Sequence, residues 1–120
     1  MEGNIIQTKS YEFALAIVDV YKRLSGERRE FVLSKQLLRS GTSIGANIEE
    51  AIGGQSDRDF FTKMTIAYKE ARETLYWLRL LGDAGYLEMD DSALLGSKCD
   101  ELCRILSKIQ LTLKSRMNSP

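Results

Sequence analysis

The 120-residue sequence contains no histidine, which removes the commonest general base and the commonest metal ligand of proteins. The Glu-x-x-His di-iron sites of many four-helix bundles are excluded with it. Cys99 and Cys103 supply too few ligands for zinc, and a disulfide between residues four apart in a helix has poor geometry. We therefore expect reduced thiols, with Cys99 in the core, and no metal, no cofactor and no catalytic residues.

An excess of either charge is also missing, because 17 Lys and Arg residues balance 17 Asp and Glu residues. Proteins that bind bulk nucleic acid usually carry a clear basic excess. No run approaches the roughly 18 apolar residues of a membrane span. Residues 1–10 lack the basic head and apolar run of a secretory signal. We therefore expect a cytoplasmic protein that has no membrane partner.

Proline is absent before the last residue, Pro120, so nothing in the sequence interrupts long helices. Glycines cluster at three breaks, and between them apolar residues recur at alternating steps of three and four. The sequence therefore predicts an all-α fold with a single four-helix-bundle domain over residues 1–120. Short loops predict an antiparallel up-down-up-down bundle. The helices are expected at about 10–25, 28–52, 56–82 and 91–117.

Polar side chains follow one line along the second predicted helix, beside its apolar stripe. Steps of three and four separate these residues, which we call the polar strip: Gln36, Arg39, Ser43, Asn47 and Glu50. Gly41 and Gly45 lie among them at a cost of about 1 kcal/mol each relative to Ala, so a close helix approach is expected. We interpret the strip as a satisfied polar network at a helix crossing. A ligand or catalytic surface, an oligomer contact and a partner site are the alternatives.

Oppositely charged residues are expected to meet if the second and third helices form a hairpin. Glu50 would then lie near Lys63, and Arg39 near Glu70 or Glu73. Removing one partner of a buried pair costs about 3–5 kcal/mol, because the other charge is left buried alone. We therefore expect Arg39→Ala to damage folding or assembly.

The third predicted helix is apolar or aromatic around most of its circumference. Beyond its main stripe, Phe61, Tyr68 and Leu75 lie on one flank and Trp77 on the other. A helix of this kind is buried on more than one side, and exposed aromatic patches mark interfaces. We therefore predict self-association through these four residues. The alternative is a few scattered surface aromatics.

Two blocks of the sequence, Arg39 to Ala51 and Phe60 to Leu78, carry a family resemblance. They resemble the four-helix-bundle family named for the open reading frames of 23S ribosomal RNA intervening sequences. The usual first block reads Arg-Ala-x-x-Ser-Ile-x-x-Asn-Ile-Ala-Glu-Gly. This sequence matches it at Arg39, Ser43, Ile44, Asn47, Ile48 and Glu50, and departs from it at Ser40, Glu49 and Ala51.

This resemblance covers nearly the whole chain and implies a ring-like homopentamer of four-helix bundles. It implies no enzymatic activity. Members of the family resemble the accessory variability protein of diversity-generating retroelements, a pentameric nucleic-acid-binding partner of a reverse transcriptase. We therefore expect a non-enzymatic, homo-oligomeric scaffold or adaptor protein.

The chain from residue 104 onward carries basic residues and no acidic ones, namely Arg104, Lys108, Lys114 and Arg116. Their ordinary role is to complement the helix dipole. In a ring the patch would repeat in every subunit and form a multivalent basic rim. Arg28 and Arg29 are expected at the same end of the bundle. The alternative function is therefore a nucleic-acid-binding accessory factor that contacts RNA or DNA through this rim.

Overall fold

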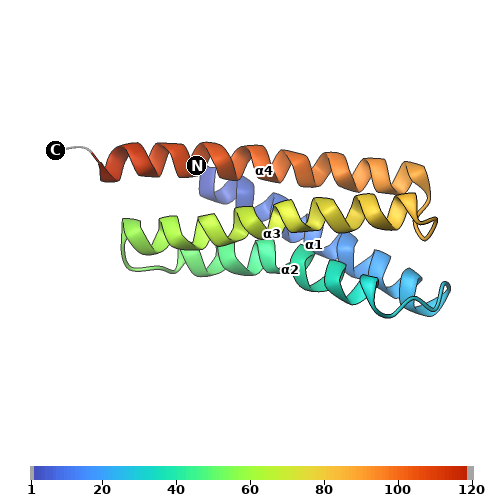
Figure 1. Ribbon diagram of the computed structural model, residues 1–120. Coiled ribbons are helices and arrows are strands. Elements are labelled where there is room, and N and C mark those ends of the chain that lie inside the picture. The colour runs from blue at the N-terminus through green and yellow to red at the C-terminus, as the bar shows by residue number, and fades with distance from the viewer. Residues whose placement is uncertain (1, 119–120) are drawn as a thin grey trace.

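The computed structural model describes residues 2–118 and folds into four helices that form a rod 54 Å long and 21 Å across (Figure 1). The helices are α1 (Glu2–Gly26), α2 (Leu33–Ile52), α3 (Asp57–Asp83) and α4 (Met89–Met117). No strand occurs among residues 2–118, so the predicted all-α class with four helices is confirmed. None of the four helices is long and apolar enough to cross a membrane.

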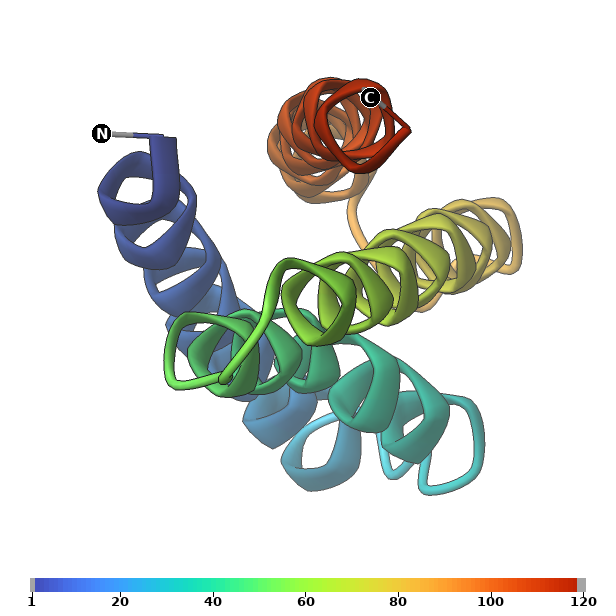
Figure 2. The same cartoon turned by 90° about the vertical axis from the view of Figure 1, so that its left-hand side faces the viewer.

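Each helix packs against two others. Contacts join α1 with α2, α2 with α3, α3 with α4, and α1 with α4, and the last of these contacts is the smallest. The view along the rod places α1 and α3 across from each other (Figure 2). The rod therefore has four long seams between neighbouring helices.

One apolar core runs the length of the rod and is built from the stripes that recur at steps of three and four. Its fully buried side chains include Ile17, Leu37, Ile44, Leu81 and Leu106. Burying a side chain of this size stabilises a fold by about 1.5–3 kcal/mol. The stripes therefore fix which face of each helix turns inward.

Helix α1 begins at Glu2, and the predicted start near residue 10 is wrong. The buried stripe continues through Ile6, and Ser10 is itself buried within the helix. The Oγ of Ser10 donates to the Gln7 carbonyl at 3.1 Å and caps nothing. A Cβ on Gly45 of α2 would lie 3.5 Å from the Ser10 hydroxyl, so this position favours a small side chain. Ser10 interrupts the apolar stripe with a polar residue, and the first turns of α1 were therefore not predicted from the sequence.

Helix α2 begins at Leu33, not at residue 28 as predicted. The chain turns at Arg29, whose φ of 55° is left-handed, and Glu30 then caps the helix. Its carboxylate accepts hydrogen bonds from the backbone N–H of Ser34 at 2.7 Å and from those of Leu33 and Val32 at 3.1 Å. Burial alone would raise the pKa of Glu30, but these donors hold the pKa below its usual value.

Helices α3 and α4 lie within two residues of their predicted bounds at both ends. Ser56 caps α3 as expected, because its Oγ accepts a hydrogen bond from the Asp59 N–H at 3.1 Å. Asp57 and Asp59 lie in the first turn, where negative charge complements the helix dipole. A cap residue and a long apolar stripe were sufficient signals for these two helices.

Gly41 lies where α1 crosses α2. A Cβ at this position would lie 2.9 Å from both Cγ atoms of Ile17. The backbone of α2 approaches α1 so closely that only glycine fits without movement. The cost of a glycine in mid-helix is therefore offset by a tight helix crossing, as the sequence analysis expected.

Candidate functional site

The polar strip of α2 borders α3, and we call this border the α2–α3 seam. Arg39 donates to Glu70 Oε1 at 3.3 Å and also pairs with Glu73. Lys63 Nζ donates to Glu50 Oε1 at 2.8 Å, and this bond and the Glu50 charge raise the pKa of Lys63. The structure thus brings together each charged residue of the strip with the partner expected from the hairpin.

The α2–α3 seam continues inward as a hydroxyl pair. Thr74 Oγ1 lies 2.9 Å from Ser40 Oγ and 2.8 Å from the Glu70 carbonyl oxygen, and both hydroxyl residues are fully buried. At the edge of the seam, Trp77 Nε1 donates to Glu73 Oε2 at 2.8 Å. Polar groups on this side of α3 are therefore satisfied within the subunit.

Of the remaining members of the polar strip, Ser43 and Asn47 bond within their own helix. Ser43 Oγ donates to the Arg39 carbonyl at 2.6 Å, Asn47 Nδ2 donates to the Ser43 carbonyl at 2.8 Å, and Gln36 is exposed. The Arg39 side chain keeps 48% of its exposure, so its ion pairs are surface pairs. Such pairs contribute about 0–1 kcal/mol. The loss of stability expected on Arg39→Ala is therefore smaller than the sequence analysis predicted for a buried pair.

The four interface candidates of α3 lie on two flanks of that helix. All of them (Phe61, Tyr68, Leu75 and Trp77) are half-buried and pack against the core of their own subunit. The neighbouring helices cover more of these side chains than the sequence analysis allowed. Two other apolar residues of α3, Ile66 and Tyr76, are the exposed ones.

Cys99 and Cys103 are buried free thiols on α4. Hydrogen bonding with Cys103 and burial raise the pKa of Cys99, which therefore stays protonated, and its Sγ lies 3.2 Å from the Ala71 carbonyl oxygen. Among the described residues, no group of three Cys, Asp and Glu side chains is placed to hold a metal ion. These cysteines pack as small apolar side chains.

The structure contradicts the expectation that Arg28 and Arg29 share an end with the last turn of α4. The side chain of Arg28 donates to the Tyr86 carbonyl at 3.0 Å, in the loop that precedes α4. The last turn of α4, which contains Lys114 and Arg116, lies at the opposite end of the rod from the loop between α3 and α4 (Figure 1). The expectation placed the end of α4 beside the start of α2, whereas the Arg28 contact places the start of α4 there.

The four basic residues in the second half of α4, Arg104, Lys108, Lys114 and Arg116, are exposed. Arg104 pairs with Asp100 at 3.6 Å, one turn earlier in the helix. Lys108, Lys114 and Arg116 form no ion pair with any residue among 5–118. A basic surface therefore exists on this helix, but it does not extend to Arg28 and Arg29.

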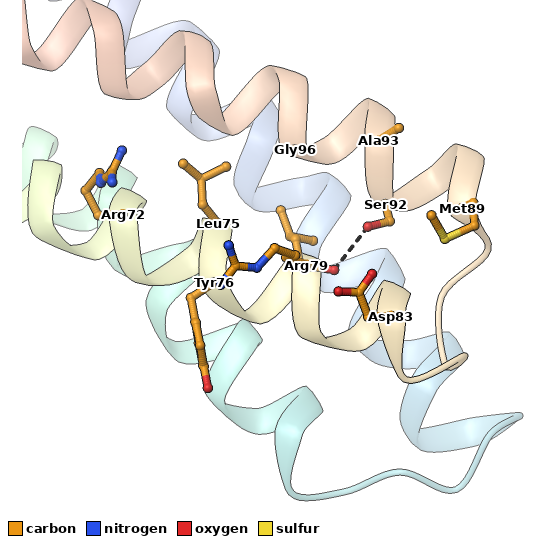
Figure 3. A pocket seen from close by; sticks show the side chains of 10 residues that line it. Arg72, Leu75, Tyr76, Arg79, Asp83, Met89, Ser92, Ala93 and Gly96 are labelled. Atoms are coloured by element: carbon orange, nitrogen blue, oxygen red, sulfur yellow. Dashed lines mark hydrogen bonds between the residues drawn. The ribbon is translucent and has the colours of Figure 1, made fainter.

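A groove of about 600 Å³ lies between α3 and α4, next to the loop that joins them (Figure 3). We call it the α3–α4 groove; its lining includes Leu75, Tyr76, Met89 and Gly96, with Arg72 and Arg79 on the α3 side. Neither arginine forms an ion pair with any side chain that the structure describes. This pair was not predicted from the sequence, although two arginines seven residues apart share a helix face.

The fold and these surfaces define a helical bundle with one paired seam and one open groove that two arginines border. The chain belongs to the 23S rRNA-intervening sequence protein family, whose model matches residues 2–108. The family resemblance seen in the sequence is therefore confirmed.

A solved structure from Bacteroides thetaiotaomicron VPI-5482 is similar to this chain. It is a protein of unknown function from the S23 ribosomal protein family, with 48% identity and a TM-score of 0.90. The similarity covers 92% of this chain and 98% of that one. A comparison with curated proteins found no match.

Proposed function

We propose that the protein is a non-enzymatic scaffold or adaptor that self-associates into a ring, and that the ring is a pentamer. The observation that carries this proposal is the exposure of large apolar side chains on a subunit whose core is already complete. Tyr11 and Leu15 of α1 are 63% and 56% exposed, and Tyr76 and Met89 beside the α3–α4 groove are 49% and 66% exposed. Exposed apolar patches of this kind are typical of interfaces.

An antiparallel up-down-up-down subunit is part of the proposal. Glu50, late in α2, meets Lys63, early in α3, whereas the earlier Arg39 meets the later Glu73. Pairs that run in opposite order along two helices support opposite helix directions. In such a bundle α1 and α3 run the same way, which bears on how copies can meet.

Light scattering of the purified protein at micromolar concentration tests the proposal. We expect a single species whose mass is five times the 13.6 kDa of one chain. A smaller or larger closed multiple would change the ring but keep the scaffold. A lone 13.6 kDa particle would overturn the self-association on which the scaffold depends.

A second candidate function is nucleic-acid binding through the exposed cations at the end of α4. The observation in its favour is that Lys108, Lys114 and Arg116 have no acidic partner among residues 5–118. A gel-shift with structured RNA and DNA at low and moderate salt tests it. Changing these three residues to Gln should weaken binding and flatten its salt dependence.

The matched control for this test changes three cations at the other end of the rod, Arg28, Arg29 and Lys35, to Gln. Both triple variants lose the same formal charge. Equal losses of binding would show that only net charge matters and would contradict a binding surface on α4. Absence of any shift for the wild type would remove this candidate function.

A further inference from the structure

The α3–α4 groove has the features of a surface that receives another helix. Its apolar floor is open at Gly96, where an added Cβ would meet nothing within 4 Å. Arg72 and Arg79 lie about 10 Å apart along α3, given a rise of about 1.5 Å per residue. Asp83, one turn further on, also lines the groove. The groove therefore presents two positive charges and then one negative charge along the α3 direction.

The outer face of α1 carries the complementary pattern. Tyr11 and Leu15 project from it as exposed apolar side chains. Glu12 and Asp19 flank them, and they are separated by the same seven residues as the two arginines of the groove. Lys22 follows and forms no ion pair with the described side chains, whereas Asp19 makes only a 3.7 Å contact with Arg23. Two negative charges and then one positive charge thus run along the α1 direction.

These two surfaces lie at the same height along the rod. At one end, Asp91 of α4 pairs with Arg23 of α1, and the adjacent Ser92 donates to the Leu78 carbonyl of α3. Further along α4, Glu101 pairs with Lys9 of α1, and Cys99 contacts Ala71 of α3. The segment of α1 between Lys9 and Arg23 is therefore level with the α3 segment that borders the groove.

We propose that α1 of one copy packs its Tyr11–Leu15 face into the α3–α4 groove of the next copy. Glu12 then meets Arg72, Asp19 meets Arg79, and Lys22 meets Asp83. This inference rests on the proposed self-association and identifies its contact surfaces. α1 and α3 lie across the subunit from each other (Figure 2), so the contact is head-to-tail. The two surfaces lie at the same height along the rod, and their helices run the same way. Neighbouring copies are therefore related by a rotation about an axis parallel to the rod, with no shift along that axis, and such a rotation can close into a ring.

Charge reversal tests the pairing. Arg72→Glu with Arg79→Glu should reduce the mass measured by light scattering to that of one chain, and so should Glu12→Arg with Asp19→Arg. All four changes in one chain should restore the wild-type mass. In an equimolar mixture the two double variants should associate with each other, but a ring of five cannot alternate two chains throughout, so the mass need not return to that of the wild type. The control for the arginine variant is Lys35→Glu with Lys108→Glu, which changes the net charge by the same amount and sign on exposed residues outside the groove and should leave the mass unchanged.

A steric variant tests the groove without changing charge. Gly96→Trp places a large side chain in the open floor of the groove and should block association, whereas Gly96→Ala should not. Circular dichroism of each variant shows whether the subunit still folds. The steric variant keeps the inference testable if a charge-reversed chain fails to fold.

The outcomes separate this inference from the proposed function. A wild type that is a monomer overturns both. An oligomeric wild type whose mass is unaffected by the reversals and by Gly96→Trp overturns this contact and leaves the scaffold in place. Dissociation of both double variants, with no association in their mixture and no restoration in the fourfold variant, overturns the direct pairing of these charges.

Discussion

The two edges of α3 differ in how their charges are satisfied. Toward α2, Glu70 and Glu73 meet Arg39, and the hydroxyls of Thr74 and Ser40 pair beneath them. Toward α4, the arginines of the α3–α4 groove meet no described acid, and the groove floor stays open. The charged groups on one edge of α3 are thus paired within the subunit, and those on the other edge are not. The open edge is where the structure offers a place for a second chain.

The largest effect should come from the core that both edges share. Leu81→Ala removes a fully buried side chain and should lower the free energy of unfolding by about 2–5 kcal/mol. Leu75→Ala, on the half-buried groove side, should cost about 1–2 kcal/mol in the subunit and weaken association instead. Urea denaturation and light scattering separate the two. Equal stability losses with no change in mass would contradict the distinction between the edges.

The next largest effect on stability should come from the hydroxyl pair of the α2–α3 seam. Thr74→Val keeps the shape of the side chain but removes its hydrogen bonds to Ser40 and to the Glu70 carbonyl. We expect the free energy of unfolding to fall by about 1–2 kcal/mol, because buried polar groups lose their partners. Thr62→Val, at an exposed site on the same helix, is the control and should change stability by less than about 0.5 kcal/mol.

The cap at the start of α2 supports the α2–α3 seam from one end, and its contribution should depend on pH. Glu30→Gln should lower the free energy of unfolding at pH 7 by about 1 kcal/mol, as loss of other N-terminal caps does. The folded-state pKa lies below the ordinary 4.5, so the carboxylate stabilises the fold above that pH. This stabilisation is lost as the pH falls through the folded-state pKa.

Thermal or urea unfolding of the wild type and Glu30→Gln at pH 7 and at more acidic pH measures this dependence. The difference between the two proteins should shrink as the pH falls below the usual carboxyl pKa. A difference that stays constant across this range would contradict the role of the carboxylate.

The surface charges of the seam should matter least. Arg39→Ala should lower the free energy of unfolding by at most about 1 kcal/mol, and less at high salt, because the guanidinium is half exposed. The mass in solution should not change. Lys35→Ala, at an exposed cation of the same helix without an ion pair to a described residue, is the matched control. A loss of several kcal/mol or a change in mass on Arg39→Ala would show that the α2–α3 seam also holds copies together.

Much of the fold could be predicted from the sequence because the apolar stripes are long and the chain lacks internal proline. The two missed helix starts have local causes. Ser10 is a buried polar residue in an apolar stripe, and Glu30 caps α2 through its side chain after the turn at Arg29. Neither feature appears in a pattern of apolar residues alone.

The site was less predictable than the fold. The charge partners across the α2–α3 seam follow from the hairpin between two consecutive helices. Arg72 and Arg79 were overlooked because their importance comes from the lack of an acidic partner among the described residues. Only the packing of α4 against α3 shows that no such partner is near them. The misplaced Arg28 shows that taking the end of a helix for its start moves an expected contact by the length of the rod.

An engineered cross-link tests most directly whether a second copy covers the open edge of α3. Leu15 and Gly96 both lie between the Lys9–Glu101 and Arg23–Asp91 ion pairs that join α1 with α4, and so at a similar height along the rod. The Leu15→Cys and Gly96→Cys changes together should therefore form a disulfide between neighbouring copies. Under oxidising conditions, a denaturing gel should show covalent multiples of the 13.6 kDa chain, and each single variant should show none. An oligomer by light scattering that yields only single chains on this gel would contradict the account.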